Sequence, residues 1–197
     1  MLRVRSVTVS VTLLIVAGLL AACSGAAATP TAAPTAASGN NNTHASATAA
    51  SDAIRLNLVA DGTQARYRVR EQLAQLSLPS DAVGVTSAVT GTLVINPDGA
   101  IVDDQSQFVV DVTGLTSDKN QRDGFVQRSL LETRQYPTVT FVPTGASGLA
   151  SPLPTSGPLT IQLSGNLTAH GPTTPATWDV TNQILRSTEM TGNATTS

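Results

Sequence analysis

The sequence is poor in the residue types that carry most protein chemistry. Cysteine occurs once, histidine twice, and aromatic residues make up 3% of the 197 positions. A single cysteine cannot form an intramolecular disulfide. Because His170 is the only histidine outside the low-complexity N-terminal part, no histidine pair is present to hold zinc or haem. We therefore expect no metal, no other cofactor and no disulfide framework.

Charge is equally scarce. Charged residues make up 12% of the chain, the net charge is -2, and Lys119 is the only lysine. Nucleic-acid binding normally requires a basic surface, so we exclude it. The sequence also lacks the Gly-x-Ser-x-Gly elbow that would supply a serine nucleophile to act with His170, the one histidine of the domain. Glu71, Asp111 and Asp179 are interpreted as solvated strand residues, not as a paired acid and base, so the chain is not predicted to be an enzyme.

The N-terminal residues have the pattern of a bacterial export signal. Two arginines precede an apolar run at residues 7–20, which is too short to be a comfortable membrane span. The run ends in Leu-Ala-Ala-Cys, which resembles a lipobox. We predict that residues 1–22 are a lipoprotein signal peptide and that Cys23 is acylated. The alternative is an ordinary cleavage site beside an unmodified cysteine.

The remaining chain divides into a tether and one domain. Residues 23–52 are almost wholly Ala, Thr, Pro, Ser, Gly and Asn. Such a segment has too little apolar surface to fold, so we predict a disordered tether. Residues 53–197 are enough for one hydrophobic core, since domains of about 100–150 residues are stable without disulfides or metals.

The domain is patterned as β-strands. Apolar and polar residues alternate over stretches bounded by turn signals such as Asn-Pro-Asp-Gly and Ser-Gly-Pro. The stretches lie at 65–69, 89–95, 108–112, 139–141, 159–163 and 176–180. Residues 117–131 break this rhythm and predict a short helix, capped by Ser117 or Asp118 and weakened by Gly124. We predict an all-β, mostly antiparallel domain with one short helix.

Two sequence blocks resemble the YceI-like family of periplasmic and secreted proteins. Residues 107–144 read QFVVDVTGLTSDKNQRDGFVQRSLLETRQYPTVTFVPT and share the family's order of strand, Leu-x-Ser, Arg-Asp, short helix, Tyr-Pro and Phe-containing strand. Residues 163–180 read LSGNLTAHGPTTPATWDV and resemble its Gly-x-Leu-Thr-x-His-Gly hairpin. The resemblance begins at about residue 66. Family members usually continue with two further strands that are missing here, so we expect a barrel that is incompletely closed.

The resemblance implies a lipocalin-like antiparallel barrel whose apolar lumen holds an isoprenoid or another long amphiphile, with no catalytic residue carried over. The residues expected to line the lumen are Tyr67, Val69, Leu93, Phe108, Val110, Phe141, Leu163 and Trp178. The same alternation would also fill a solid β-sandwich. An extracytoplasmic adhesion or assembly module with a filled core and no small-molecule ligand therefore stays open.

These observations lead to one functional expectation. We expect an extracytoplasmic protein, anchored to a bacterial cell membrane through acylated Cys23, that binds or transports a long-chain polyprenyl or fatty-acyl lipid. The sequence specifies neither the individual lipid nor the oligomeric state.

Overall fold

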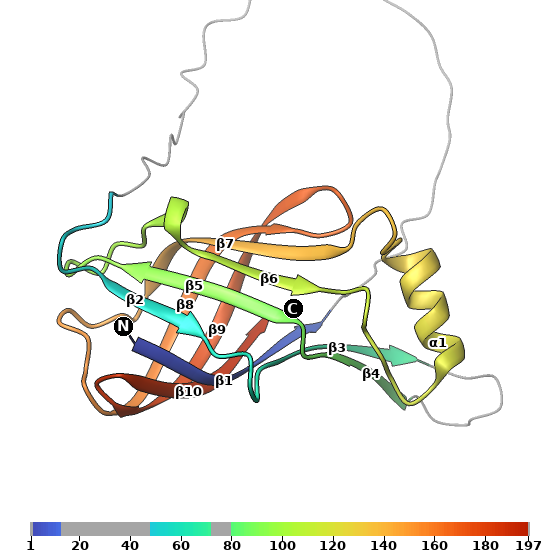
Figure 1. Ribbon diagram of the computed structural model, residues 1–197, viewed down its shortest axis with the longest axis horizontal. Coiled ribbons are helices and arrows are strands. Elements are labelled where there is room, and N and C mark those ends of the chain that lie inside the picture. The colour runs from blue at the N-terminus through green and yellow to red at the C-terminus, as the bar shows by residue number, and fades with distance from the viewer. Residues whose placement is uncertain (1, 13–47, 72–79, 197) are drawn as a thin grey trace, which may run out of the picture.

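The computed structural model describes residues 2–12, 48–71 and 80–196, and its strands form one strongly curled sheet (Figure 1). The strands are β1 (Leu2–Thr12), β2 (Ile54–Leu58), β3 (Gln64–Glu71), β4 (Ser80–Thr86), β5 (Val89–Ile95), β6 (Gln107–Asp111), β7 (Thr138–Ser147), β8 (Gly157–Thr168), β9 (Thr173–Arg186) and β10 (Glu189–Thr196). Their order is β10-β9-β8-β7-β6-β5-β2-β1-β3-β4. Every pairing that does not involve β1 is antiparallel.

The predicted strands are confirmed. The six alternating stretches fall in β3 and β5 to β9, with Val112 one residue beyond β6. In β8, Leu159, Ile161 and Leu163 are buried while the residues between them are exposed. Successive side chains of a strand point to opposite faces, so this alternation aims one face of the sheet into the barrel. The all-β fold with one short helix is therefore confirmed.

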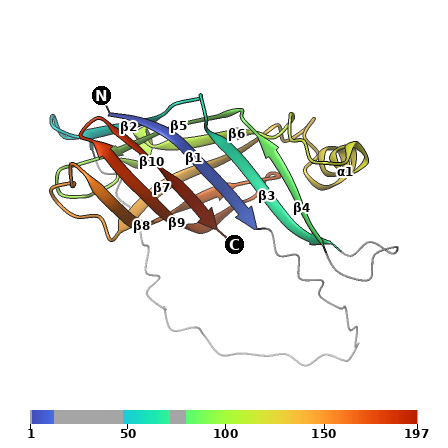
Figure 2. The same cartoon turned by 90° about the horizontal axis from the view of Figure 1, so that it is seen from below.

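β1 closes the barrel. It runs parallel to β10 on one side and to β2 and then β3 on the other, with Arg3 opposite Glu189 and Val11 opposite Tyr67. The sheet thus returns on itself, as the view from below shows (Figure 2). The sequence predicts a barrel that is incompletely closed; in the structure, β1 fills the gap between β10 and β2. β1 belongs to the segment predicted as a signal peptide, and the removal of that peptide stays a prediction.

A short helix covers one end of the barrel beside the β3–β4 hairpin (Figures 1 and 2). It comprises α1 (Asn120–Phe125) and a π-helical turn over Val126–Leu130. The helix starts later than predicted, because Ser117 is engaged elsewhere: its Oγ and backbone N–H both donate to Asp123 Oδ1, at 2.6 and 2.8 Å. Lys119 occupies the cap position without a side-chain cap.

The hydrophobic core lies inside the curl of the sheet. Its buried residues come from β2, β5, β7, β8, β9 and β10, and from the loop after β5; they are Leu56, Leu93, Ile95, Ile101, Phe141, Leu159, Ile161, Leu163, Trp178, Val180, Ile184 and Met190. Across the described residues, no helix has the length and apolar character to cross a bilayer.

Candidate functional site

The barrel encloses a cavity of about 530 Å³. This lies within the range of about 300–1,000 Å³ that is typical of small-molecule sites. The residues predicted to line the lumen all lie on its wall, namely Tyr67, Val69, Leu93, Phe108, Val110, Phe141, Leu163 and Trp178. Their contact with a ligand stays a prediction. The charged or amide side chains on the wall are Arg66, Glu71, Arg122 and Asn182, so the wall is overwhelmingly apolar.

Two aromatic residues of the wall lie flat over glycines of the neighbouring strand. Tyr67 pairs with Gly84 and Phe108 pairs with Gly91 across the sheet. A Cβ atom at Gly84 would lie 2.1 Å from the Tyr67 ring, and one at Gly91 would lie 2.2 Å from the Phe108 ring. The missing side chains let both rings lie against the wall, which leaves the centre of the barrel open. Sequence alternation locates the aromatic residues but gives no sign of this arrangement.

Trp178 is one of the aromatic residues of the cavity wall. Its ring meets that of Phe141 at 5.8 Å between centroids and 57° between planes, a favourable tilted contact. Among the described residues, Trp178 Nε1 and Asn182 Oδ1 are buried without a hydrogen-bond partner. Both residues belong to β9 and face the lumen. Nearly everything else that a ligand would meet here is hydrocarbon.

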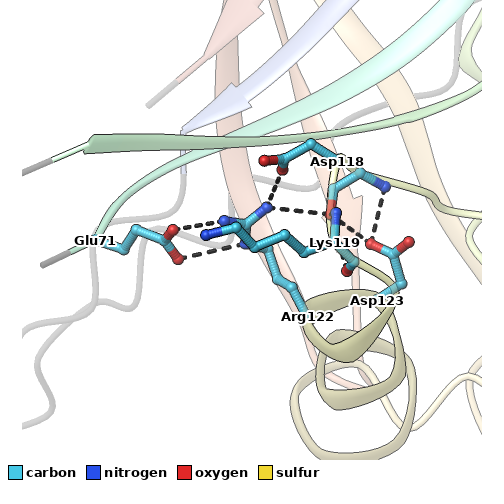
Figure 3. A network of polar contacts seen from close by, with 6 residues as sticks. Glu71, Asp118, Lys119, Arg122 and Asp123 are labelled. Carbon is cyan, nitrogen blue, oxygen red and sulfur yellow. Dashed lines mark hydrogen bonds and ion pairs between the residues drawn. The ribbon is translucent and has the colours of Figure 1, made fainter. Parts of the chain in front are cut away.

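A polar network joins the helix to the end of β3, and two of its residues, Glu71 and Arg122, also lie on the cavity wall (Figure 3). Arg122 donates from Nη2 to Glu71 Oε1 at 2.5 Å and from Nε to Oε2 at 3.3 Å. Its Nη1 also donates to Asp118 and to Ser117 Oγ. The Arg122 and Glu71 side chains are only 12% and 24% exposed. The expectation of a solvated Glu71 is therefore wrong, because the helix folds over the end of β3.

Burial and charge shift several pKa values around this network. Burial raises the pKa of the Tyr67 phenol above 10.0, and the nearby Asp123 carboxylate adds to the effect. The hydrogen bond from Arg122 lowers the pKa of Asp118, and the bond to Glu71 raises the pKa of Arg122 itself. Tyr67 is thus neutral and Arg122 charged at physiological pH. The network fits structural support better than proton transfer.

The other residues weighed in the sequence lie away from the cavity wall. His170 sits in the β8–β9 turn, where its Nε2 lies 3.0 Å from Glu132 Oε2 and its ring packs on Tyr136. Asp111 accepts hydrogen bonds from Thr113, and Asp179 accepts one from Gln162. Within the described ranges no cluster of three metal-ligating side chains occurs. Cys23 lies outside the described residues.

Comparison with known proteins gives a family match. The model of the YceI-like domain matches residues 56–197. Among solved structures, a YceI protein of Campylobacter jejuni is 14% identical with a TM-score of 0.43, over 57% of this chain and 61% of that one. A polyisoprenoid binding domain from Saccharophagus degradans, described as implicated in plant cell wall breakdown, is 18% identical with a TM-score of 0.45, over 63% of this chain and 65% of that one. The chain thus spans under two thirds of either. No curated protein matches it.

Proposed function

Because the chain belongs to the YceI-like domain family, we propose that it binds one long-chain lipid, polyprenyl or fatty-acyl, inside its barrel. The observation that carries this proposal is the cavity of about 530 Å³ with its nearly continuous apolar wall. A slender hydrocarbon chain matches such a wall, whereas a sugar or nucleotide would lose hydrogen bonds to water that the wall cannot replace.

Hydrophobic burial supplies enough free energy for this binding. At about 25 cal/mol per Å², burying roughly 400 Å² of lipid tail contributes about 10 kcal/mol before association costs. Before those costs, this corresponds to a dissociation constant of about 0.05 μM, and subtracting about 4 kcal/mol leaves about 40 μM. The few polar groups would orient the ligand rather than provide affinity. The open lumen argues against the alternative of an adhesion or assembly module with a filled core.

Native mass spectrometry of the full chain, followed by organic extraction, tests the proposal. We expect one long-chain lipid per protein. A substitution that fills the lumen, Val110→Trp, should abolish this occupancy, because Val110 lies on the cavity wall. Val109→Trp is the matched control, since Val109 is its neighbour on β6 and is not part of the wall. A folded chain that contains no lipid and takes up no added polyprenol or fatty acid would refute the function.

The position at the membrane is a second part of the proposal. Removal of residues 1–22, which include β1, and acylation of Cys23 would anchor the chain to the outer face of a bacterial membrane. Residues 23–52 would then be the tether that holds the barrel close to its lipid source. Labelling of cells with an alkyne fatty acid tests this step. We expect the label on the wild-type chain and none on Cys23→Ser. Equal labelling of both would place the modification elsewhere.

A further inference from the structure

Two large apolar side chains of the helix are exposed at the end of the barrel. Phe125 is 54% exposed and Leu130 is 42% exposed, and both also line the cavity. We propose that this end of the molecule docks on an anionic lipid bilayer, through a surface formed by Phe125, Arg128, Leu130 and Arg134. This docking surface rests on the proposed function, since it is where a lipid chain would enter the lumen.

The local backbone fixes the two apolar residues outward. Val126, between them, is 7% exposed and anchors the segment to the barrel. The π-helical turn, closed by the Leu131 N–H bond to the Val126 carbonyl at 2.8 Å, brings residues five positions apart to similar sides of the helix. Phe125 and Leu130 are separated by that spacing. The exposed pair is therefore held by a buried residue and a hydrogen bond.

The charges around the exposed pair favour a negatively charged partner. The acidic residues of the segment are already engaged: Asp118 with Arg122, Asp123 with Ser117 and Glu132 with His170. Arg128 and Arg134 are exposed, and neither forms an ion pair with another described residue. The Arg128 guanidinium lies back over Gly124, 2.8 Å from where a Cβ would stand.

Exposed apolar side chains beside exposed arginines match the lipid interface better than a protein partner. Apolar side chains enter the acyl boundary while arginines meet anionic headgroups, each contributing to membrane association. The same two residues touch both solvent and the cavity, so a lipid chain moving from the bilayer into the lumen would remain against hydrocarbon. A protein partner would cover the entrance and leave no such route.

Tryptophan quenching in proteoliposomes tests the docking. Trp178→Phe removes the single tryptophan of the sequence, and Phe125→Trp, Leu130→Trp or Leu185→Trp then introduces one tryptophan into each variant of the full chain. Each variant is bound to vesicles of phosphatidylcholine and phosphatidylglycerol that contain brominated phosphatidylcholine, which quenches the fluorescence of a tryptophan that enters the bilayer. Leu185 is the matched control, because it is 52% exposed and lies near the far end of β9. That strand starts at the His170 turn beside the helix and is 14 residues long, which places its ends about 45 Å apart.

We expect strong quenching at positions 125 and 130 and little at position 185. Equal quenching at all three positions, or none at 125 and 130, would overturn the docking surface, however the chain is anchored. Circular dichroism of each variant establishes that it is folded. If Trp178→Phe does not fold, a nitroxide-labelled lipid and a fluorophore attached through Phe125→Cys or Leu185→Cys, in the Cys23→Ser chain, give the same comparison.

A second measurement uses the arginines and leaves the aromatic residues unchanged. In stopped-flow transfer of a fluorescent fatty acid from anionic vesicles to the full chain, Arg128→Gln and Arg134→Gln should each slow uptake about fivefold. Transfer from pure phosphatidylcholine and the amount bound at equilibrium should not change. Arg55→Gln, on the opposite end with Arg186, is the control. Unchanged uptake by both variants would contradict the role of charge, whereas failure of every chain to take up lipid would refute the proposed function instead.

Discussion

Arg122 and Glu71 form a two-pronged ion pair that joins the helix to the last residue of β3. The two bonds measure 2.5 and 3.3 Å, and both side chains are largely shielded from water. Removing one partner of such a pair leaves the other charge without compensation, so Arg122→Ala should lower the free energy of unfolding by about 2–4 kcal/mol. Urea denaturation measures this loss.

The control for this ion pair is an exposed ion pair of an arginine on β3. Arg68 lies 3.9 Å from Asp81, and the two side chains are 66% and 51% exposed. An exposed pair of this kind contributes about 0–1 kcal/mol. Arg68→Ala should therefore leave the urea midpoint almost unchanged. Equal losses for the two variants would mean that the Arg122 contacts give no special stability.

Two strand glycines should respond differently to the same substitution. A Cβ at Gly165 would lie 2.2 Å from the Val142 carbonyl oxygen and 2.7 Å from Pro143 Cα, whereas one at Gly145 would meet nothing within 4 Å. Backbone atoms cannot give way as a flexible side chain can. Gly165→Ala should cost about 2 kcal/mol or more, while Gly145→Ala should change stability by less than about 1 kcal/mol. Thermal unfolding of both variants checks the contrast.

Acid should weaken the attachment of the helix. The pKa of Asp118 is lowered in the folded state by the hydrogen bond from Arg122. A depressed folded pKa stabilises the fold above the ordinary pKa of about 4, and this stabilisation is lost as the pH falls through the folded value. The pH dependence of unfolding below about pH 4 should therefore be shallower in Asp118→Asn. Curves of identical slope would show that this bond does not contribute.

Alkaline pH should lower the stability of the fold through Tyr67, whose pKa is raised chiefly by burial. A raised folded pKa stabilises the fold below the ordinary value of 10.0, and this contribution is lost as the pH rises through the folded value. In Tyr136→Phe, Tyr67 is the only tyrosine, so absorbance at the phenolate band follows it alone. We expect a midpoint above that of the urea-unfolded chain. A midpoint equal to the unfolded one would mean that the phenol is solvated.

The sequence predicted the strands whose alternation is clear and missed those whose alternation is weak. β8 was recognisable because large aliphatic residues occupy every second position, whereas β10 reads as polar and buries only Met190. The same alternation placed the residues expected to line the lumen on the inward face of their strands, and their contact with a ligand stays a prediction. The contact of Glu71 with Arg122 could not follow, because it joins residues 51 positions apart through a helix placed by tertiary packing. Nor could a hollow centre be distinguished from a filled one, since both require the same inward-facing residues.

The parallel pairing of β1 with β10 also determines when the barrel can close during synthesis. Residues 2–12 leave the ribosome before every other described strand, yet one of their partners is β10, the last of them. The hairpins from β5 to β10 need only local contacts and can form as they emerge, while the pairing of β1 with β10 must wait until β10 has emerged. The side of the barrel between β10 and β2 therefore closes last while β1 is present, and removal of residues 1–22, as proposed together with the acylation of Cys23, would leave that side open in the anchored chain.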